Sequence, residues 1–177
     1  MDRMHTLEFI QEQINNSTIM TKEEKDAYLK TYKKNYYAWL DDLKCRLNNY
    51  APLFNDLETR KSISPSFKYV KHNLKGEIWK EFPLNNKYTV SNLGRIKYEG
   101  VIQKQKDEKT QYVTLANEKL RKDYIYKFVA YTFLGKKDGD GYQVHHITND
   151  GYYNTVDNLV LLTKEEHSYV HGFKVSS

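Results

Sequence analysis

Hydrophobic positions in the first sixty residues recur with the period of a helix. The first stripe is short and amphipathic and consists of Leu7, Ile10 and Ile14. The second continues to about residue 48 at intervals of three and four residues, through Leu29, Tyr32, Tyr36, Leu40, Leu43 and Leu47. Thr21 and Glu24 have the spacing of a capping box, which marks the start of the longer helix. The pattern predicts a hairpin of two helices.

The apolar face of the longer helix is wide and aromatic, because Tyr37 and Trp39 lie beside the stripe. A two-helix unit can hardly bury such a face alone. Two interpretations stay open. The face packs on the short helix or on the C-terminal domain, or residues 5–48 form a surface for a homodimer or a partner protein. We therefore predict a helical dimerisation or partner-binding segment over residues 1–60.

Lysines and serines are frequent in the next stretch, which indicates a basic linker over residues 61–75. Alternating apolar residues then predict short strands, which fall within residues 77–83, 88–97, 101–103 and 112–115. We expect a tight turn at Asn92–Gly94 and a charged loop at residues 104–109. Together these strands predict a small antiparallel β module over residues 76–123.

The last part of the chain has the pattern of a strand, a loop, a strand and a helix. Val144 and Ile147 belong to the first strand, and the run of apolar residues at 159–162 forms the second. The connection contains Asp150-Gly151, which is typical of a hairpin loop. Thr163 and Glu166 form a second capping box, so a short helix should continue to about residue 171. The predicted fold class is α+β.

Three of the six histidines fall within twenty-three residues of this unit, at positions 145, 146 and 167. Neutral imidazole accepts protons near pH 7 and also binds transition metals. Asn158 stands at the start of the second strand, nine residues before His167. Residue types, spacing and expected secondary structure agree, and they indicate a site.

These residues resemble the HNH endonuclease family, whose core is a ββα-metal (His-Me finger) fold around one metal ion. The resemblance implies that His145 and His167 hold the ion and that His146 is the general base. It also implies that Asn158 braces the hairpin. The HNH domain would cover residues 124–177, beginning with a helix whose Phe128, Val129 and Phe133 pack under the hairpin.

Other residues near this motif are candidates for accessory roles. Asn154 lies in the loop and His171 lies one turn beyond His167. Both family ligand positions are histidine here, where many relatives have Asp or Asn. Imidazole suits Zn, Ni, Co or Mn better than the oxygen-preferring Mg, so we expect one divalent ion among these five without a presumption of Mg.

A second resemblance involves Glu77-x-Trp79 and Tyr88-x-Val90-Ser91-Asn92-x-Gly94-Arg95-Ile96. It is similar to a small nuclease-associated DNA-binding module found ahead of HNH domains in homing and phage endonucleases. Trp79, Tyr88, Val90 and Ile96 would form a small β core. The expected DNA contacts are basic side chains that point to solvent or phosphate, namely Arg95, Lys97, Lys104 and, on the following helix, Lys127.

Charge is concentrated in the middle of the chain. Residues 61–137 carry seventeen Lys and Arg against seven Asp and Glu, whereas residues 1–60 carry nine against ten and residues 138–177 two against six. Such a concentration is typical of a polyanion partner. No apolar run approaches eighteen residues, and there is one cysteine, so we expect no membrane span and no internal disulfide.

The sequence therefore predicts a metal-dependent HNH endonuclease of the homing or phage type that nicks or cuts double-stranded DNA to 5′-phosphate and 3′-hydroxyl ends. We expect it in the cytoplasm, that of the host cell if a phage encodes it. The alternative is a DNA- or protein-binding factor or inhibitor of phage type that acts through its helical N-terminus on an HNH scaffold.

Overall fold

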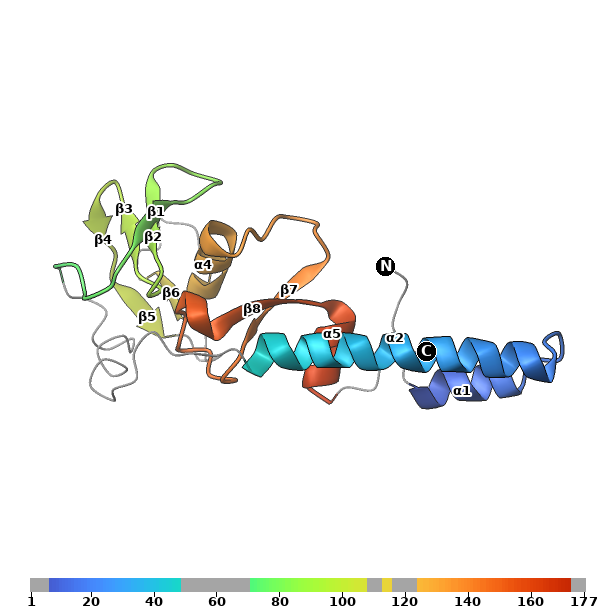
Figure 1. Ribbon diagram of the computed structural model, residues 1–177. Helices are drawn as coiled ribbons and strands as arrows, with labels where there is room; N and C mark the ends of the chain where they lie inside the picture. The colour runs from blue at the N-terminus through green and yellow to red at the C-terminus, as the bar shows by residue number, and fades with distance from the viewer. Residues whose placement is uncertain (1–6, 49–70, 108–112, 116–123, 173–177) are drawn as a thin grey trace. The chain divides into compact units, whose positions relative to one another are not determined.

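The computed structural model describes residues 7–48, 71–107, 113–115 and 124–172 (Figure 1). The chain divides into two units. Residues 1–49 and 164–177 form one, called here the helical unit, and residues 50–163 form the other, called the sheet unit. Most of the predicted linker at 61–75 lies outside the described residues. Among those residues, no helix is both long enough and apolar enough to cross a membrane.

The described residues of the helical unit form α1 (Leu7–Asn15), α2 (Lys22–Asn48) and α5 (Lys164–Val170). The predicted capping box of α2 is confirmed, since the Thr21 backbone N–H donates to Glu24 Oε2 (2.8 Å) and the Glu24 N–H donates to Thr21 Oγ1 (3.2 Å). α1 and α2 pack against each other as a hairpin. Lys25 Nζ donates to the Asn15 carbonyl (3.0 Å) across the turn.

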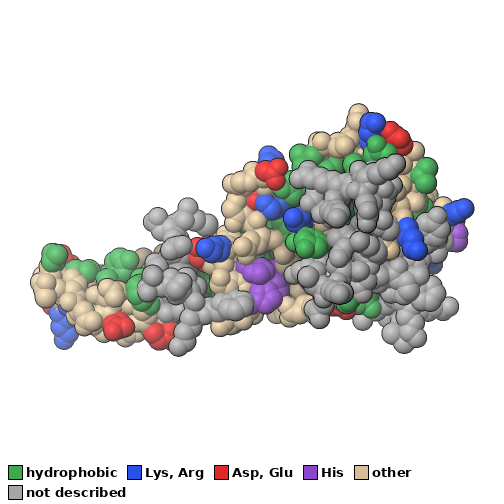
Figure 2. Space-filling model, turned by 180° about the vertical axis from the view of Figure 1, so that it is seen from behind, with side chains coloured by type: hydrophobic (Ala, Val, Ile, Leu, Met, Phe, Trp, Pro, Cys, Tyr) green, Lys and Arg blue, Asp and Glu red, His purple; other side chains and the backbone are tan. Residues whose placement is uncertain are grey.

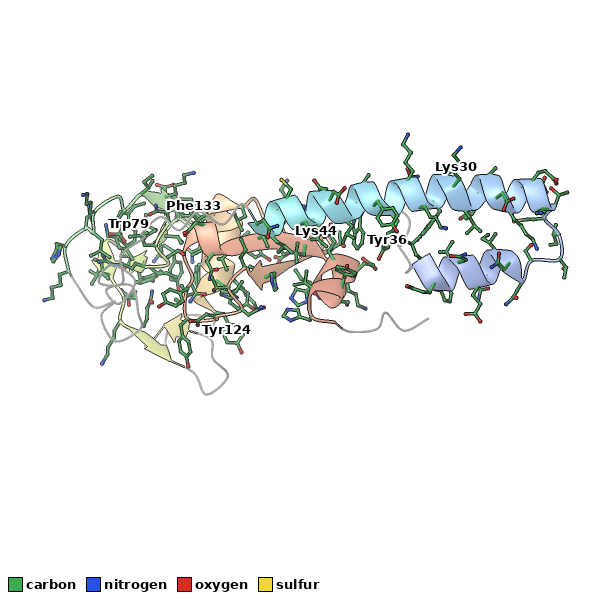
Figure 3. All side chains as sticks on the ribbon, turned by 60° about the horizontal axis from the view of Figure 1, so that its bottom comes forward. Lys30, Tyr36, Lys44, Trp79, Tyr124 and Phe133 are labelled. Atoms are coloured by element: carbon green, nitrogen blue, oxygen red, sulfur yellow. The ribbon has the colours of Figure 1, made fainter. Side chains whose placement is uncertain are left out.

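The C-terminal half of α2 also contacts α5. The Trp39 and Tyr169 rings lie 5.5 Å apart, and Arg46 forms an ion pair with Glu166. Leu43 lies between Trp39 and Arg46 on the same helix face and is buried. Part of the aromatic stripe is therefore covered within the chain itself. Figure 3 labels Tyr36, which lies on this stripe, and Lys44, which is exposed.

The sheet unit contains a four-stranded antiparallel sheet in the order β1-β2-β3-β4, formed by β1 (Trp79–Glu81), β2 (Tyr88–Ser91), β3 (Ile96–Tyr98) and β4 (Val101–Ile102). Val90 pairs with Ile96 across the predicted tight turn. A separate hairpin follows, β5 (Gln105–Asp107) with β6 (Val113–Leu115). The charged loop expected at residues 104–109 is thus wrong in part, because β5 pairs with β6.

The described part of the unit also contains a second hairpin and a helix. The strands are β7 (Tyr142–His146) and β8 (Leu159–Thr163), joined by a loop that ends in the short 3₁₀ helix η1 (Val156–Asn158). The helix α4 (Ile125–Phe133) contacts the sheet on β2 and the hairpin on β7 and β8. Its Phe128 and Val129 are buried, as expected, and Phe133 is partly buried against the same core.

One hydrophobic core joins the sheet to the hairpin. It consists of Phe82, Tyr88, Val90, Ile96, Ile125, Phe128, Val129 and Leu159. The Phe82 and Phe128 rings lie 4.8 Å apart, so the sheet is bound directly to α4. Tyr88, Val90 and Ile96 have the core positions that the sequence predicted. The fold as a whole is a mixture of helices and small antiparallel sheets, and it contains the predicted order of strand, loop, strand and helix.

Candidate active site

His146 is the last residue of β7 and is paired in register with Leu159, the first residue of β8. Its imidazole is buried, and its Nε2 lies 3.0 Å from Oδ1 of Asn154, in the loop between the strands. The ring of Tyr126, on α4, packs edge-on against it at 5.5 Å. These contacts hold the ring in one orientation.

The contacts of Asn154 indicate which ring nitrogen of His146 is the basic one. The Asn154 Nδ2 donates to the Tyr152 carbonyl (3.4 Å), which turns Oδ1 toward the histidine. An amide oxygen only accepts hydrogen bonds, so Nε2 carries the hydrogen in the neutral ring. The basic lone pair is then on Nδ1. Asn154 is fully buried, so this bond is shielded from water.

Asn158 bridges the two ends of the same loop. Its Oδ1 accepts from the Thr148 backbone N–H (3.0 Å), and its Nδ2 donates to the Tyr153 carbonyl (2.8 Å). Its own backbone carbonyl accepts from the Ile147 N–H (2.9 Å). The side chain is completely buried. One buried amide therefore ties together two backbone groups at different points of the loop.

His145, His167 and His171 each carry an imidazole, a side chain that binds transition metals. His145 is buried beside His146 on β7, in the sheet unit. In the helical unit, the His167 and His171 rings lie 4.5 Å apart. Burial lowers the pKa of His167, and the neighbouring His171 lowers it further. The neutral form, which binds metals, is thereby favoured.

Arg95 does not have the exposed position expected of a DNA contact, and that prediction is wrong. Its side chain is 1% exposed and forms an ion pair with Glu77 (2.9 Å), which is itself buried. The guanidinium also donates to the His72 carbonyl (3.1 Å). Burial lowers the pKa of Arg95, while Glu77 opposes that effect. Arg95 therefore fastens residues 72–77 to the sheet.

The other three basic candidates are at least partly accessible. Lys97 is half-buried, with Nζ 3.8 Å above the Trp79 ring, and Lys104 is exposed. Lys127 is half-buried, with Nζ 5.5 Å from the Tyr124 ring. Figure 3 labels Trp79 and Tyr124. Where Figure 2 draws side chains, Lys and Arg are spread over the visible face rather than gathered in one patch.

Two features of the site were not anticipated from the sequence. Tyr126 belongs to the helix before the hairpin, and the contact of its ring with that of His146 was not expected. The buried contact of Gly94 with Asn154 also joins residues sixty positions apart. The only signal for it in the sequence was the tight Asn-x-Gly turn, which fixes the local backbone but not what packs against it.

Comparison with known proteins gives one loose structural likeness. No family model matches the sequence, and no curated protein matches it. A solved structure described as "DNA binding and cleavage by the HNH homing endonuclease I-HmuI" aligns with 23% sequence identity and a TM-score of 0.44. The alignment covers 56% of this chain and 62% of that one. A likeness at this level does not establish a shared family or function.

Proposed function

We propose that the protein is a metal-dependent DNA endonuclease of the HNH type, which hydrolyses a phosphodiester bond to 5′-phosphate and 3′-hydroxyl ends. The observation that carries the proposal is the buried His146, whose Nε2 is bonded to Asn154. Such a bond fixes the tautomer and the direction of a general base. His145 and Asn158 stand in the same hairpin.

In the proposed reaction, His146 accepts the proton of the attacking water at Nδ1. As the ring gains charge, the Asn154 oxygen stabilises the Nε2–H that points toward it. Tyr126 limits ring rotation from the other side. Asn158 holds the loop that carries Asn154, so it acts on the base indirectly.

The donor set fits a divalent ion of intermediate softness. His145 and His167 would hold it, and His171 is a further ligand candidate. When bound, such an ion supplies positive charge to the phosphate and to the departing 3′ oxygen. Because the ligands are all imidazoles, we expect Mn, Co, Ni or Zn to be bound more tightly than Mg.

A second candidate function is that of a DNA- or protein-binding factor that acts through α1 and α2. Tyr28 and Tyr37 favour it, because both are large and about half exposed on α2. This factor would bind its partner without any need for the His146 base. Loss of the base therefore separates the two functions.

The test is incubation of supercoiled plasmid with full-length wild type, His146→Ala and the control His72→Ala, first without metal and then with each of the five ions. His72 is exposed, and only its backbone carbonyl accepts from Arg95, so the control removes an imidazole outside the site. We expect nicking by wild type and by the control, and a loss of about 10²–10⁴-fold in His146→Ala with DNA binding retained.

A His167→Ala variant in the same assay tests the ion. We expect a weaker response in a metal titration followed by calorimetry, with activity lost in parallel. An unchanged titration would reject His167 as a ligand. Equal cleavage by wild type and His146→Ala would reject the base, and no cleavage with any ion would favour the binding factor.

A further inference from the structure

The loop that carries Asn154 rests on the turn between β2 and β3. In this turn the Gly94 N–H donates to the Ser91 carbonyl (3.0 Å), and the Leu93 N–H donates to the Ser91 hydroxyl (2.9 Å). Gly94 has a φ of +75°, which favours glycine. Asn92 and Leu93 are buried, although a turn of this kind is usually exposed to solvent.

The two loops meet through backbone contacts. The Val156 N–H donates to the Asn92 carbonyl (2.8 Å). A Cβ added at Gly94 would lie 2.6 Å from the Asn154 carbonyl oxygen and 3.0 Å from the Asn154 Cβ. On its other side, the Gly94 carbonyl accepts from Gln105 Nε2 (2.6 Å). The turn is thus fixed by β5 and leaves no room between itself and Asn154.

These contacts form a continuous path from the sheet to His146. The turn seats the Asn154 backbone, and the Asn154 side chain binds Nε2 of His146. We propose that Gly94 is a positioning residue for His146. The β2–β3 turn holds the backbone of Asn154 in place, and the Asn154 side chain then holds the imidazole of His146 in the orientation of a general base. The inference rests on the proposed function, and it gives the β module a role in the chemistry as well as in DNA contact.

The Asn154 backbone must be held closely in place, because its side chain makes a hydrogen bond to His146 and such bonds have a short range. The Asn154–His146 distance is 3.0 Å, and a shift of less than 1 Å takes it beyond hydrogen-bonding range. A side chain at position 94 would meet backbone atoms, which cannot rotate away as the end of a flexible side chain does. Asn154 or the turn would have to move.

Gly100 offers a matched control for Gly94. It also has a positive φ (+80°), in the turn between β3 and β4, but an added Cβ there would meet nothing within 4 Å. Both Gly94→Ala and Gly100→Ala carry the strain of a left-handed alanine. Only Gly94→Ala also disturbs Asn154, so the difference between the two variants measures the effect of the contact between Gly94 and Asn154.

The experiment compares full-length wild type, Gly94→Ala and Gly100→Ala by long-range ¹H–¹⁵N spectra of the histidine rings, at a pH where they are neutral. The His146 signals are assigned by their loss in His146→Ala. We expect a single tautomer with hydrogen on Nε2 in wild type and Gly100→Ala, and a mixture in Gly94→Ala. For plasmid nicking, kcat of Gly94→Ala should fall by about 10–100-fold with a smaller change in KM.

A double variant tests the path itself. Asn154→Ala removes the bond to His146, so adding Gly94→Ala should change the ring spectrum and kcat no further. Additive losses would overturn the inference, as would equal spectra for Gly94→Ala and Gly100→Ala. If Gly94→Ala does not fold, Gln105→Ala replaces it, because it removes the support of the turn from β5. An unchanged His146 tautomer in that variant would also overturn the inference.

The readouts separate this inference from the proposed function. The ring spectra report the seating of His146 whether or not the wild type cuts DNA. If wild type does not cut DNA but the His146 tautomer still differs between Gly94→Ala and Gly100→Ala, the nuclease function is rejected and the contact of Gly94 with Asn154 is only structural. If wild type cuts DNA but the tautomer is the same in Gly94→Ala and Gly100→Ala, the positioning role of Gly94 is rejected and the nuclease function stands.

Discussion

At the residue scale, the hairpin loop depends on Asn158. Replacing this buried residue with alanine removes the partner of the exposed Thr148 N–H and of the half-buried Tyr153 carbonyl. Each of the two hydrogen bonds contributes about 0.5–1.5 kcal/mol net, so Asn158→Ala should lower the free energy of unfolding by about 1–3 kcal/mol. Urea denaturation measures this.

The matched control for Asn158 is Asn85→Ala. Asn85 is exposed, and its Oδ1 accepts from the Lys87 N–H (3.1 Å) within a surface turn. Its loss should change stability by about 0.5 kcal/mol or less. Equal effects of the two substitutions would contradict the bridging role of Asn158.

The sequence could predict residues whose partners are close along the chain, and it could not predict those whose partners are distant. The sequence placed His146 and Asn158 in one hairpin, and both are buried there; their roles stay a prediction. Arg95 was misplaced, because a basic residue after a turn looks exposed until Glu77, eighteen positions earlier, is seen beside it. Whether a charge is buried depends on its partner, which no local pattern indicates.

At the scale of elements, α5 depends on its ion pair with α2. Glu166 is 5% exposed, and Arg46 contacts both of its carboxylate oxygens. Arg46→Ala leaves a buried carboxylate without this partner and should lower the free energy of unfolding by ~1–3 kcal/mol. Thermal unfolding checks this against Lys44→Ala, an exposed lysine on the same helix.

A double-mutant cycle shows whether that loss belongs to the pair. Adding Glu166→Gln to Arg46→Ala removes the stranded charge, so the double variant should be more stable than the sum of the single losses implies. Strict additivity would mean that the two side chains do not interact. It would also leave Trp39 and Tyr169 as the main described contact between α2 and α5.

The helices were predictable because their signals are local, whereas some pairings were not. The period of the apolar residues and the Thr21 capping box predicted both N-terminal helices. The β5–β6 pairing joins Gln105 to Leu115 across a charged segment, so the sequence indicated a loop there. The contact of α2 with α5 joins residues 120 positions apart, and no periodicity reports such a distance.

At the scale of the whole molecule, the excess positive charge lies in the middle of the chain. If Lys97 and Lys104 contact phosphates, replacing both with alanine should weaken DNA binding. The slope of log K against log salt should also become smaller by about 1 for each phosphate that is no longer neutralised. Fluorescence anisotropy with a labelled duplex at several salt concentrations measures both quantities.

Lys87→Ala is the control for this experiment. Lys87 lies just before β2 and is already paired with Glu99 at 2.9 Å, so its removal should change the slope little. An affinity that ignores both salt and the Lys97 and Lys104 changes would mean that the sheet does not bind the DNA backbone. The charge distribution could be read from the sequence, but which lysines remain accessible depended on the fold.

The close backbone contacts between the β2–β3 turn and the loop that carries Asn154 also limit how parts of this chain could be combined with parts of other proteins. A sheet that is proposed to contact DNA is an attractive part to exchange between proteins when a new target is wanted. Here the turn of the sheet shares backbone contacts with the loop of the hairpin, at Gly94 with Asn154 and at Asn92 with Val156. A chimera that imports only the sheet would have to reproduce this fit, so the sheet and the hairpin are best transplanted together.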